Sequence, residues 1–107
     1  MPGPATLPEL LPETDTQTRR QPPYAVVLHN DDFNGMGWVL LVLKKVFGYD
    51  DTKCMTHMTE AHETGKSVVW IGALELAELK ADQIVGCGSD PDAPKAEPLR
   101  VTVEPVE

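Results

Sequence analysis

The distribution of proline limits where regular structure can form in this chain. Six of the ten prolines lie in the first 23 residues, and the other four lie within Pro91–Pro105. Proline has no backbone N–H and is poorly tolerated inside helices and central strands. The pattern predicts one compact domain over residues 24–104, with a continuous part over 24–85, a Pro/Gly-rich loop over 86–98 and a closing segment near Leu99–Val103.

The residues outside this domain have a different composition. Residues 1–23 combine Pro, Thr, Glu and Gln with few apolar side chains. Such a segment buries too little apolar surface to offset the entropy of ordering, so a disordered N-terminal arm is expected. Two roles remain open for it: a solubilising tail, or transient docking on a partner through its leucines. Residues 105–107 are expected to form a short tail.

The chain is acidic along its whole length. The formal net charge is −8, with −1 over residues 1–23, −4 over 24–89 and −3 over 90–107. Binding to phosphate backbones needs clustered Lys and Arg, so nucleic acid is not expected as a partner. An acidic surface instead favours cationic ligands, and a free α-ammonium group is one of these.

Cysteine content and hydropathy point to the cytoplasm. Cys54 and Cys87 are the two cysteines, and their number and spacing do not resemble a disulfide framework. Both are expected to be reduced thiols in a cytoplasmic protein. The start of the sequence lacks the pattern of a signal peptide, and the longest uncharged apolar stretch, Gly35–Leu43, is too short to span a bilayer. No membrane association is expected.

The first part of the domain shows a strand, a loop and a helix. Tyr24–His29 is a short β-rich run that predicts a buried strand. Turn-forming residues follow, and Asn34 is a suitable N-cap for a helix. Apolar side chains then recur at helical spacing from Met36 to Phe47, and Gly48 is expected to end the helix.

The remaining elements complete an α+β fold. Asp50 and Asp51 suit the start of a second helix, and Gly65 suits its end. The patterns then predict further elements at Ser67–Ile71 (strand), Ala73–Val85 (helix) and Leu99–Glu104 (strand). The order β-α-α-β-α-β predicts a small three-stranded antiparallel sheet with three helices on one face.

Polar residues and methionines in two segments suggest a binding pocket. Asn30 and Asp31 open the loop after the first strand, and His62 lies near the end of the second helix. Met36 follows the loop, and Met58 lies one turn before His62. An α-ammonium has three N–H donors, which an amide oxygen, an imidazole nitrogen and a carboxylate can accept. Flexible methionine walls suit a bulky side chain.

These motifs resemble the ClpS family of adaptors, which recognise N-degrons for Clp proteases. The resemblance extends over about residues 24–84 and resumes at Pro98–Glu104. It is carried by five segments: Val27-Leu28-His29-Asn30-Asp31-Asp32-Phe33, Met36, Ala61-His62-Glu63-Thr64-Gly65-Lys66, Ala77-Glu78-Leu79-Lys80 and Pro98-Leu99. The combination of N-D-D-F with H-x-x-G at this distance is specific, whereas either motif alone is weak.

The resemblance implies a role for each matching position in recognising a client. Asn30 and His62 would hydrogen-bond the client's α-amino group, and Asp31 would assist through water and its negative potential. Met36 would exclude β-branched first residues. The side-chain pocket would be lined by Val39, Met58, Leu99 and, in place of a larger apolar residue, Ala61. Preferred clients would begin with Phe, Leu, Tyr or Trp.

The resemblance also implies partners and excludes catalysis. Such an adaptor delivers clients to the N-domain of a Clp AAA+ unfoldase of the ClpA or ClpC type, and Glu75 and Lys80 match the positions that dock on it. The N-terminal arm would assist delivery. The adaptor is not an enzyme and needs no cofactor, and no Gly-rich phosphate loop is present.

The chain departs from the family pattern in four places. Asn34-Gly35-Met36-Gly37 stands where Thr-Pro-Met-Glu is usual, and the two glycines loosen the first helical turn. Ala61 should widen the pocket. Ala73 replaces a Thr or Ser cap. Gly86-Cys87-Gly88 breaks the third helix before a Pro-rich loop that leads to Leu99.

Three other interpretations of these residues remain open. A zinc site could use Cys54, His57, His62 and Cys87, although His57 and His62 do not share a helix face well. A hydrolase pairing His62 with Asp31 lacks a nucleophile in a recognisable setting. The fold could also modulate an unfoldase without binding N-termini. His57 is otherwise expected to be a surface residue.

Overall fold

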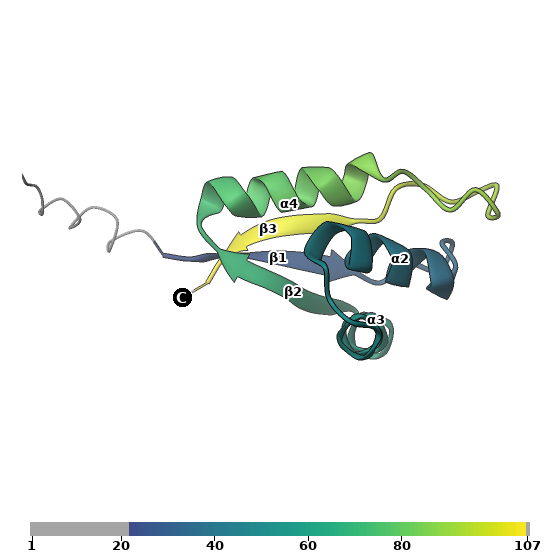
Figure 1. Cartoon of the computed structure of the whole chain (residues 1–107), viewed down its shortest axis with the longest axis horizontal. Coiled ribbons are helices and arrows are strands. Elements are labelled where there is room, and N and C mark those ends of the chain that lie inside the picture. The colour runs from purple at the N-terminus through teal and green to yellow at the C-terminus, as the bar shows by residue number, and fades with distance from the viewer. Residues whose placement is uncertain (1–21, 107) are drawn as a thin grey trace, which may run out of the picture.

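The computed structural model describes residues 22–106, which form one sheet and three helices (Figure 1). The elements in chain order are β1 (Tyr24–His29), α2 (Met36–Phe47), α3 (Asp51–Thr64), β2 (Lys66–Gly72), α4 (Leu74–Gly86) and β3 (Val101–Pro105). The predicted β-α-α-β-α-β order and α+β fold class are confirmed. The expected N-terminal arm lies outside the described residues, apart from Pro22 and Pro23.

β1 forms the centre of the sheet because its β-branched and apolar run can be buried on both faces. The strand order is β2-β1-β3, and both pairings are antiparallel. Leu28 of β1 lies opposite Ser67 on one side and Val101 on the other. Ala25, Val26, Val27 and Leu28 are all buried.

A β-bulge interrupts the pairing of β1 with β2. Val26 lies opposite Trp70, whereas the next residue, Val27, lies opposite Val68, so Val69 is the additional residue. A bulge disturbs the alternation of side chains along its strand. As a result, the consecutive residues Val69 and Trp70 both contact the hydrophobic core.

The three helices cover one face of the sheet. Figure 1 shows α4 running alongside β3 and α3 lying beside β2, and each of these pairs is in contact. Val26 and Leu28 point from β1 into a core that also contains Val42, Leu43, Cys54, Ala77, Ile84 and Leu99. None of the helices within residues 22–106 has the length and apolar character of a membrane span.

The start of α2 differs from the prediction. The N-cap of α2 is Gly35, with no side-chain capping hydrogen bond, so the assignment of Asn34 as the N-cap is wrong. The side chain of Asn34 is buried and hydrogen-bonds to other segments. The end of α2 is as expected: Gly48 has φ 72° and donates its N–H to Lys44 O. Glycine adopts this left-handed conformation without steric cost.

The boundaries of the other two helices follow the sequence signals closely, whereas the start of β3 does not. The Asp50 side chain caps α3 by accepting from Lys53 N at 2.8 Å, and Gly65, with φ 97°, ends it. Ala73 is the N-cap of α4 and makes no side-chain capping bond. The third strand begins at Val101, so Leu99 lies before β3 and not within it as predicted.

His57 is not the surface residue that was expected. It is half-buried, and its Nδ1 lies 2.9 Å from Ser67 Oγ on β2. Its ring stacks on Tyr49, with centroids 5.8 Å apart. Ser67 is 1% exposed and donates its hydroxyl proton to Glu60 Oε1. His57 therefore helps to fasten α3 to β2.

The position of His57 predicts a loss of stability in mild acid. Burial, followed by the Lys53 charge, lowers the pKa of His57 from its ordinary value of 6.5 against the opposing effect of Glu60. In acid the unfolded chain then binds more protons at this residue than the folded chain does. The contribution of His57 to the free energy of unfolding is therefore fully present above about pH 6.5 and is lost as the pH falls below it. Thermal denaturation should show a lower Tm at about pH 5 than at about pH 7.5. A His57→Gln variant should show a smaller decrease, and an unchanged decrease would exclude this cause.

Candidate functional site

A pocket of about 380 Å³ opens where the ends of β1 and α3 meet the start of α2. All eight residues assigned to client binding from the sequence line it: Asn30, Asp31, Met36, Val39, Met58, Ala61, His62 and Leu99. Sequence reasoning did not assign Leu28, His29, Asp32, Phe33, Asn34, Gly35 or Thr59 to the pocket, although they also line it. Residues far apart in the chain therefore share one concave site, as is typical of binding pockets.

Backbone hydrogen bonds hold Asn30 beside the end of α3. Its N–H donates to Gly65 O at 2.9 Å, and its carbonyl accepts from Arg100 Nη2 at 3.1 Å. Its side-chain Nδ2 donates to Asp32 Oδ1 at 3.3 Å. No hydrogen bond within residues 22–106 uses its Oδ1, so that oxygen is the acceptor that the side chain can offer to a ligand.

Asp31 organises the loop between β1 and α2, residues 30–35. Its Oδ1 accepts from Phe33 N at 2.8 Å and Asn34 N at 2.9 Å, and its Oδ2 accepts from Asn34 Nδ2 at 2.6 Å. Burial raises the pKa of Asp31, but the hydrogen bonds from Asn34 and Phe33, together with the Arg100 charge, outweigh this effect and hold it below its ordinary value of 3.8. Asp31 thus keeps a negative charge at the pocket while most of its acceptor capacity serves the loop.

His62 lies in the last turn of α3 and lines the pocket with an exposed side chain. Gly65 closes that helix through its N–H to Ala61 O at 2.9 Å, and its own carbonyl accepts from Asn30 N. This second bond brings the end of β1 to the end of α3. His62 and Asn30 therefore reach the same pocket although they are distant in sequence.

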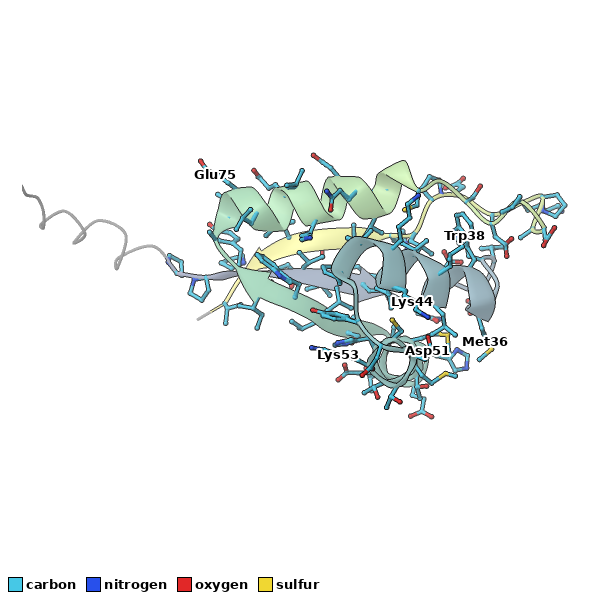
Figure 2. All side chains as sticks on the ribbon, in the orientation of Figure 1. Met36, Trp38, Lys44, Asp51, Lys53 and Glu75 are labelled. Carbon is cyan, nitrogen blue, oxygen red and sulfur yellow. The ribbon has the colours of Figure 1, made fainter. Side chains whose placement is uncertain are left out.

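The apolar part of the pocket is built from buried side chains. Val39, Met58, Ala61 and Leu99 are 7%, 7%, 4% and 2% exposed. Met36 is different, because it is 65% exposed and lies at the outer end of α2 (Figure 2). Buried walls with one flexible side chain at the entrance form a site that can admit an apolar group.

The two predicted partner-binding residues lie away from this pocket. Glu75 is exposed in the first turn of α4, and Figure 2 shows it at the opposite end of the molecule from Met36. Lys80 is half-buried, and its Nζ donates to Val46 O at 3.1 Å, near the C-terminal end of α2. Lys80 therefore already has a structural contact within the chain.

The four side chains of the alternative zinc site are not brought together in the part of the chain that the structure describes. Within residues 22–106, no group of three or more His, Cys, Asp or Glu side chains is placed to hold a metal. Cys54 is buried and donates to Tyr49 O at 3.7 Å. Burial raises the pKa of its thiol above the ordinary value of 9.0, and Asp51 acts in the same direction. A protonated, buried thiol is a poor nucleophile.

Comparison with known proteins gives a consistent family. The model for "ATP-dependent Clp protease adaptor protein ClpS" matches residues 19–102. The chain is 40% identical over 79 residues to the ATP-dependent Clp protease adapter protein ClpS of Aromatoleum aromaticum, and the match covers 72% of this chain and 76% of the relative. It is 33% identical over 92 residues to ClpS of Myxococcus xanthus, with 85% and 82% covered.

A solved structure agrees in both fold and sequence. The structure of Agrobacterium tumefaciens ClpS2 bound to L-phenylalaninamide matches with a TM-score of 0.71 and 33% identity, and the match covers 81% of this chain and 100% of that one. The order of helices and strands is the same. The chain therefore belongs to the ClpS family of ATP-dependent Clp protease adaptors, and it is an adaptor, not an enzyme.

Proposed function

We propose that this adaptor binds the free N-terminal residue of client proteins in the pocket and delivers those clients to a Clp AAA+ unfoldase. The observation that carries the proposal is the meeting of hydrogen-bond acceptors and an apolar cavity in a single pocket. The ClpS2 relative is bound to L-phenylalaninamide, a molecule with a free α-amino group and an aromatic side chain. The pocket described here offers a matching group for each of these two features.

The polar side of the pocket would recognise the α-ammonium. The Oδ1 of Asn30 and a ring nitrogen of His62 supply two acceptors for its N–H groups. The Asp31 carboxylate adds a negative potential and can accept through water. Acetylation of the amino group would remove the charge and add bulk, so a blocked N-terminus would be rejected.

The apolar side would recognise the first side chain. Val39, Met58, Ala61 and Leu99 would surround a phenyl, indole or isobutyl group and remove it from water. The small Ala61 leaves additional width in the pocket. Met36, at the entrance, would exclude side chains that branch at Cβ.

Delivery would use a different surface. We assign docking on the N-domain of a ClpA- or ClpC-type unfoldase to α4, with Glu75 and Lys80 as contacts. Glu75 is exposed and lies far from Met36, so a client and an unfoldase could be held at the same time. Lys80 would have to exchange its bond to Val46 O for a contact with the partner.

Fluorescence anisotropy with short labelled peptides that differ only at the first residue tests the client specificity. Peptides beginning with Phe, Leu or Trp are expected to bind, and peptides beginning with Val or Gly are expected to bind weakly or not at all. The reason is that Gly fills none of the apolar cavity and Val branches at the position that Met36 restricts. A Lys45→Ala variant, changed at an exposed position on α2, is the matched control and should keep the same ranking. Equal binding of the Phe and Gly peptides would contradict the proposal.

A further inference from the structure

Asn34 is the most deeply buried polar side chain around the pocket, at 7% exposed. Its Nδ2 donates to Asp31 Oδ2 at 2.6 Å and to Glu97 O at 2.8 Å. Its Oδ1 accepts from Asp90 N at 2.7 Å. Both donor protons and the amide oxygen are thus in use, which is the arrangement expected of a buried amide that fixes its surroundings.

These bonds connect two segments that are distant in sequence. Asp31 belongs to the β1–α2 loop, whereas Asp90 and Glu97 belong to the α4–β3 loop, residues 87–100. Near its end the α4–β3 loop contains Leu99, which is 2% exposed and forms part of the apolar wall of the pocket. Asn34 therefore contacts both the segment that bears the polar groups and the segment that places Leu99.

Two further contacts tie the same two regions together. Asp90 Oδ2 accepts from Gly35 N at 3.1 Å, so its carboxylate lies at the N-terminus of α2, where negative charge is favourable. A Cβ at Gly35 would lie 2.9 Å from that oxygen, so glycine permits the close approach. Trp38 Nε1 donates to Gly88 O at 3.3 Å, and Figure 2 shows Trp38 on the side of α2 that faces this loop.

We propose that Asn34 is a positioning residue for client recognition, which sets the spacing between the Asp31 side and the Leu99 side of the pocket by holding the α4–β3 loop against the β1–α2 loop. This inference rests on the proposed function of the pocket. The loop contributes Leu99 directly. Gly88, Asp90 and Glu97 act through their hydrogen bonds to Trp38, Gly35 and Asn34. Ligand binding should consequently change the surroundings of the Asp90 backbone amide, although Asp90 does not line the pocket.

The test combines affinity with backbone amide NMR. In the wild-type protein, L-phenylalaninamide should shift the amide signal of Asp90 together with those of pocket residues. Asn34→Ala should weaken binding of a Phe-initiated peptide about tenfold, because it leaves buried groups of both loops without partners. In this variant the ligand should still shift the pocket signals, but not that of Asp90. A residue with a purely structural role would not uncouple these two responses.

A second variant and a control keep the outcome decisive. Gly35→Ala should displace the Asp90 carboxylate while the Asn34 side chain stays in place. This variant should also weaken binding of the Phe-initiated peptide, by less than Asn34→Ala does, and it provides the test if Asn34→Ala does not fold. Lys95→Ala, at an exposed position of the same loop, should bind like the wild type. If the wild type binds no peptide, the proposed function fails. If the wild type binds and its Asp90 signal does not respond, the positioning role of Asn34 is refuted. It is also refuted if Asn34→Ala and Gly35→Ala both bind the peptide as tightly as the wild type does.

Discussion

Replacing Asn30 with alanine is expected to weaken binding of a Phe-initiated peptide by about ten- to a hundredfold. The variant removes the Oδ1 acceptor, and a hydrogen bond to a charged group contributes about 1.5–3 kcal/mol. The backbone bonds of Asn30 to Gly65 O and Arg100 Nη2 do not involve the side chain, so the loop should keep its path. Anisotropy titrations of both proteins with the same labelled peptide measure the change.

Asp32 supplies the matched control for this substitution. Its Oδ1 accepts from Asn30 Nδ2, and its side chain is exposed. Asp32→Ala should therefore loosen the orientation of the Asn30 amide without removing the acceptor, and the loss should be several times smaller. Undiminished binding by Asn30→Ala would show that the amide is not a ligand contact, whatever the result for Asp32→Ala.

The second large effect concerns the core and not the pocket. Leu43 lies on α2, is 0% exposed and belongs to the core between the sheet and the helices. Leu43→Ala should lower the free energy of unfolding by about 2–5 kcal/mol, because burial of the side chain is lost and a cavity remains. Small domains have a total stability of about 5–15 kcal/mol, so a large fraction would be lost. Urea denaturation followed by circular dichroism measures the difference.

Leu41 on the same helix separates this burial effect from helix propensity. Its side chain is 53% exposed, and both substitutions replace leucine with alanine in α2. Leu41→Ala should change the free energy of unfolding by no more than about 0.5 kcal/mol. Similar losses for the two variants would mean that Leu43 does not hold the core together in the way described.

The elements of the fold were accessible from the sequence because their signals are local. The β-rich run at Tyr24–His29, the cap at Asp50 and the glycines Gly48 and Gly65 each act within a few residues. The bulge at Val69 had no such signal, since it depends on how β2 pairs with β1. The start of β3 at Val101 was likewise set by pairing with Leu28 and not by composition.

Two short motifs suggested the polar residues and the methionines of the pocket, and the family resemblance implied its other residues. Neither indicated the contacts that support the pocket. Asn34 looked like a helix cap, because Asn commonly accepts from the first turn of a helix. In the structure its partners include Asp90 and Glu97, and nothing in the local sequence indicates contacts at that distance. The prediction that His57 lies at the surface was wrong for the same reason: its hydrogen-bond partner Ser67 lies on a different element, β2.

Isothermal titration of the protein with L-phenylalaninamide and with N-acetyl-L-phenylalaninamide tests most directly whether the pocket recognises a free N-terminal residue. The two compounds share the side chain and differ at the amino group that would meet Asn30, Asp31 and His62. We expect saturable binding of the free amine and no measurable binding of the acetylated compound. Equal binding of both compounds would contradict recognition of the amino group, and no binding of either would mean that the pocket has another use.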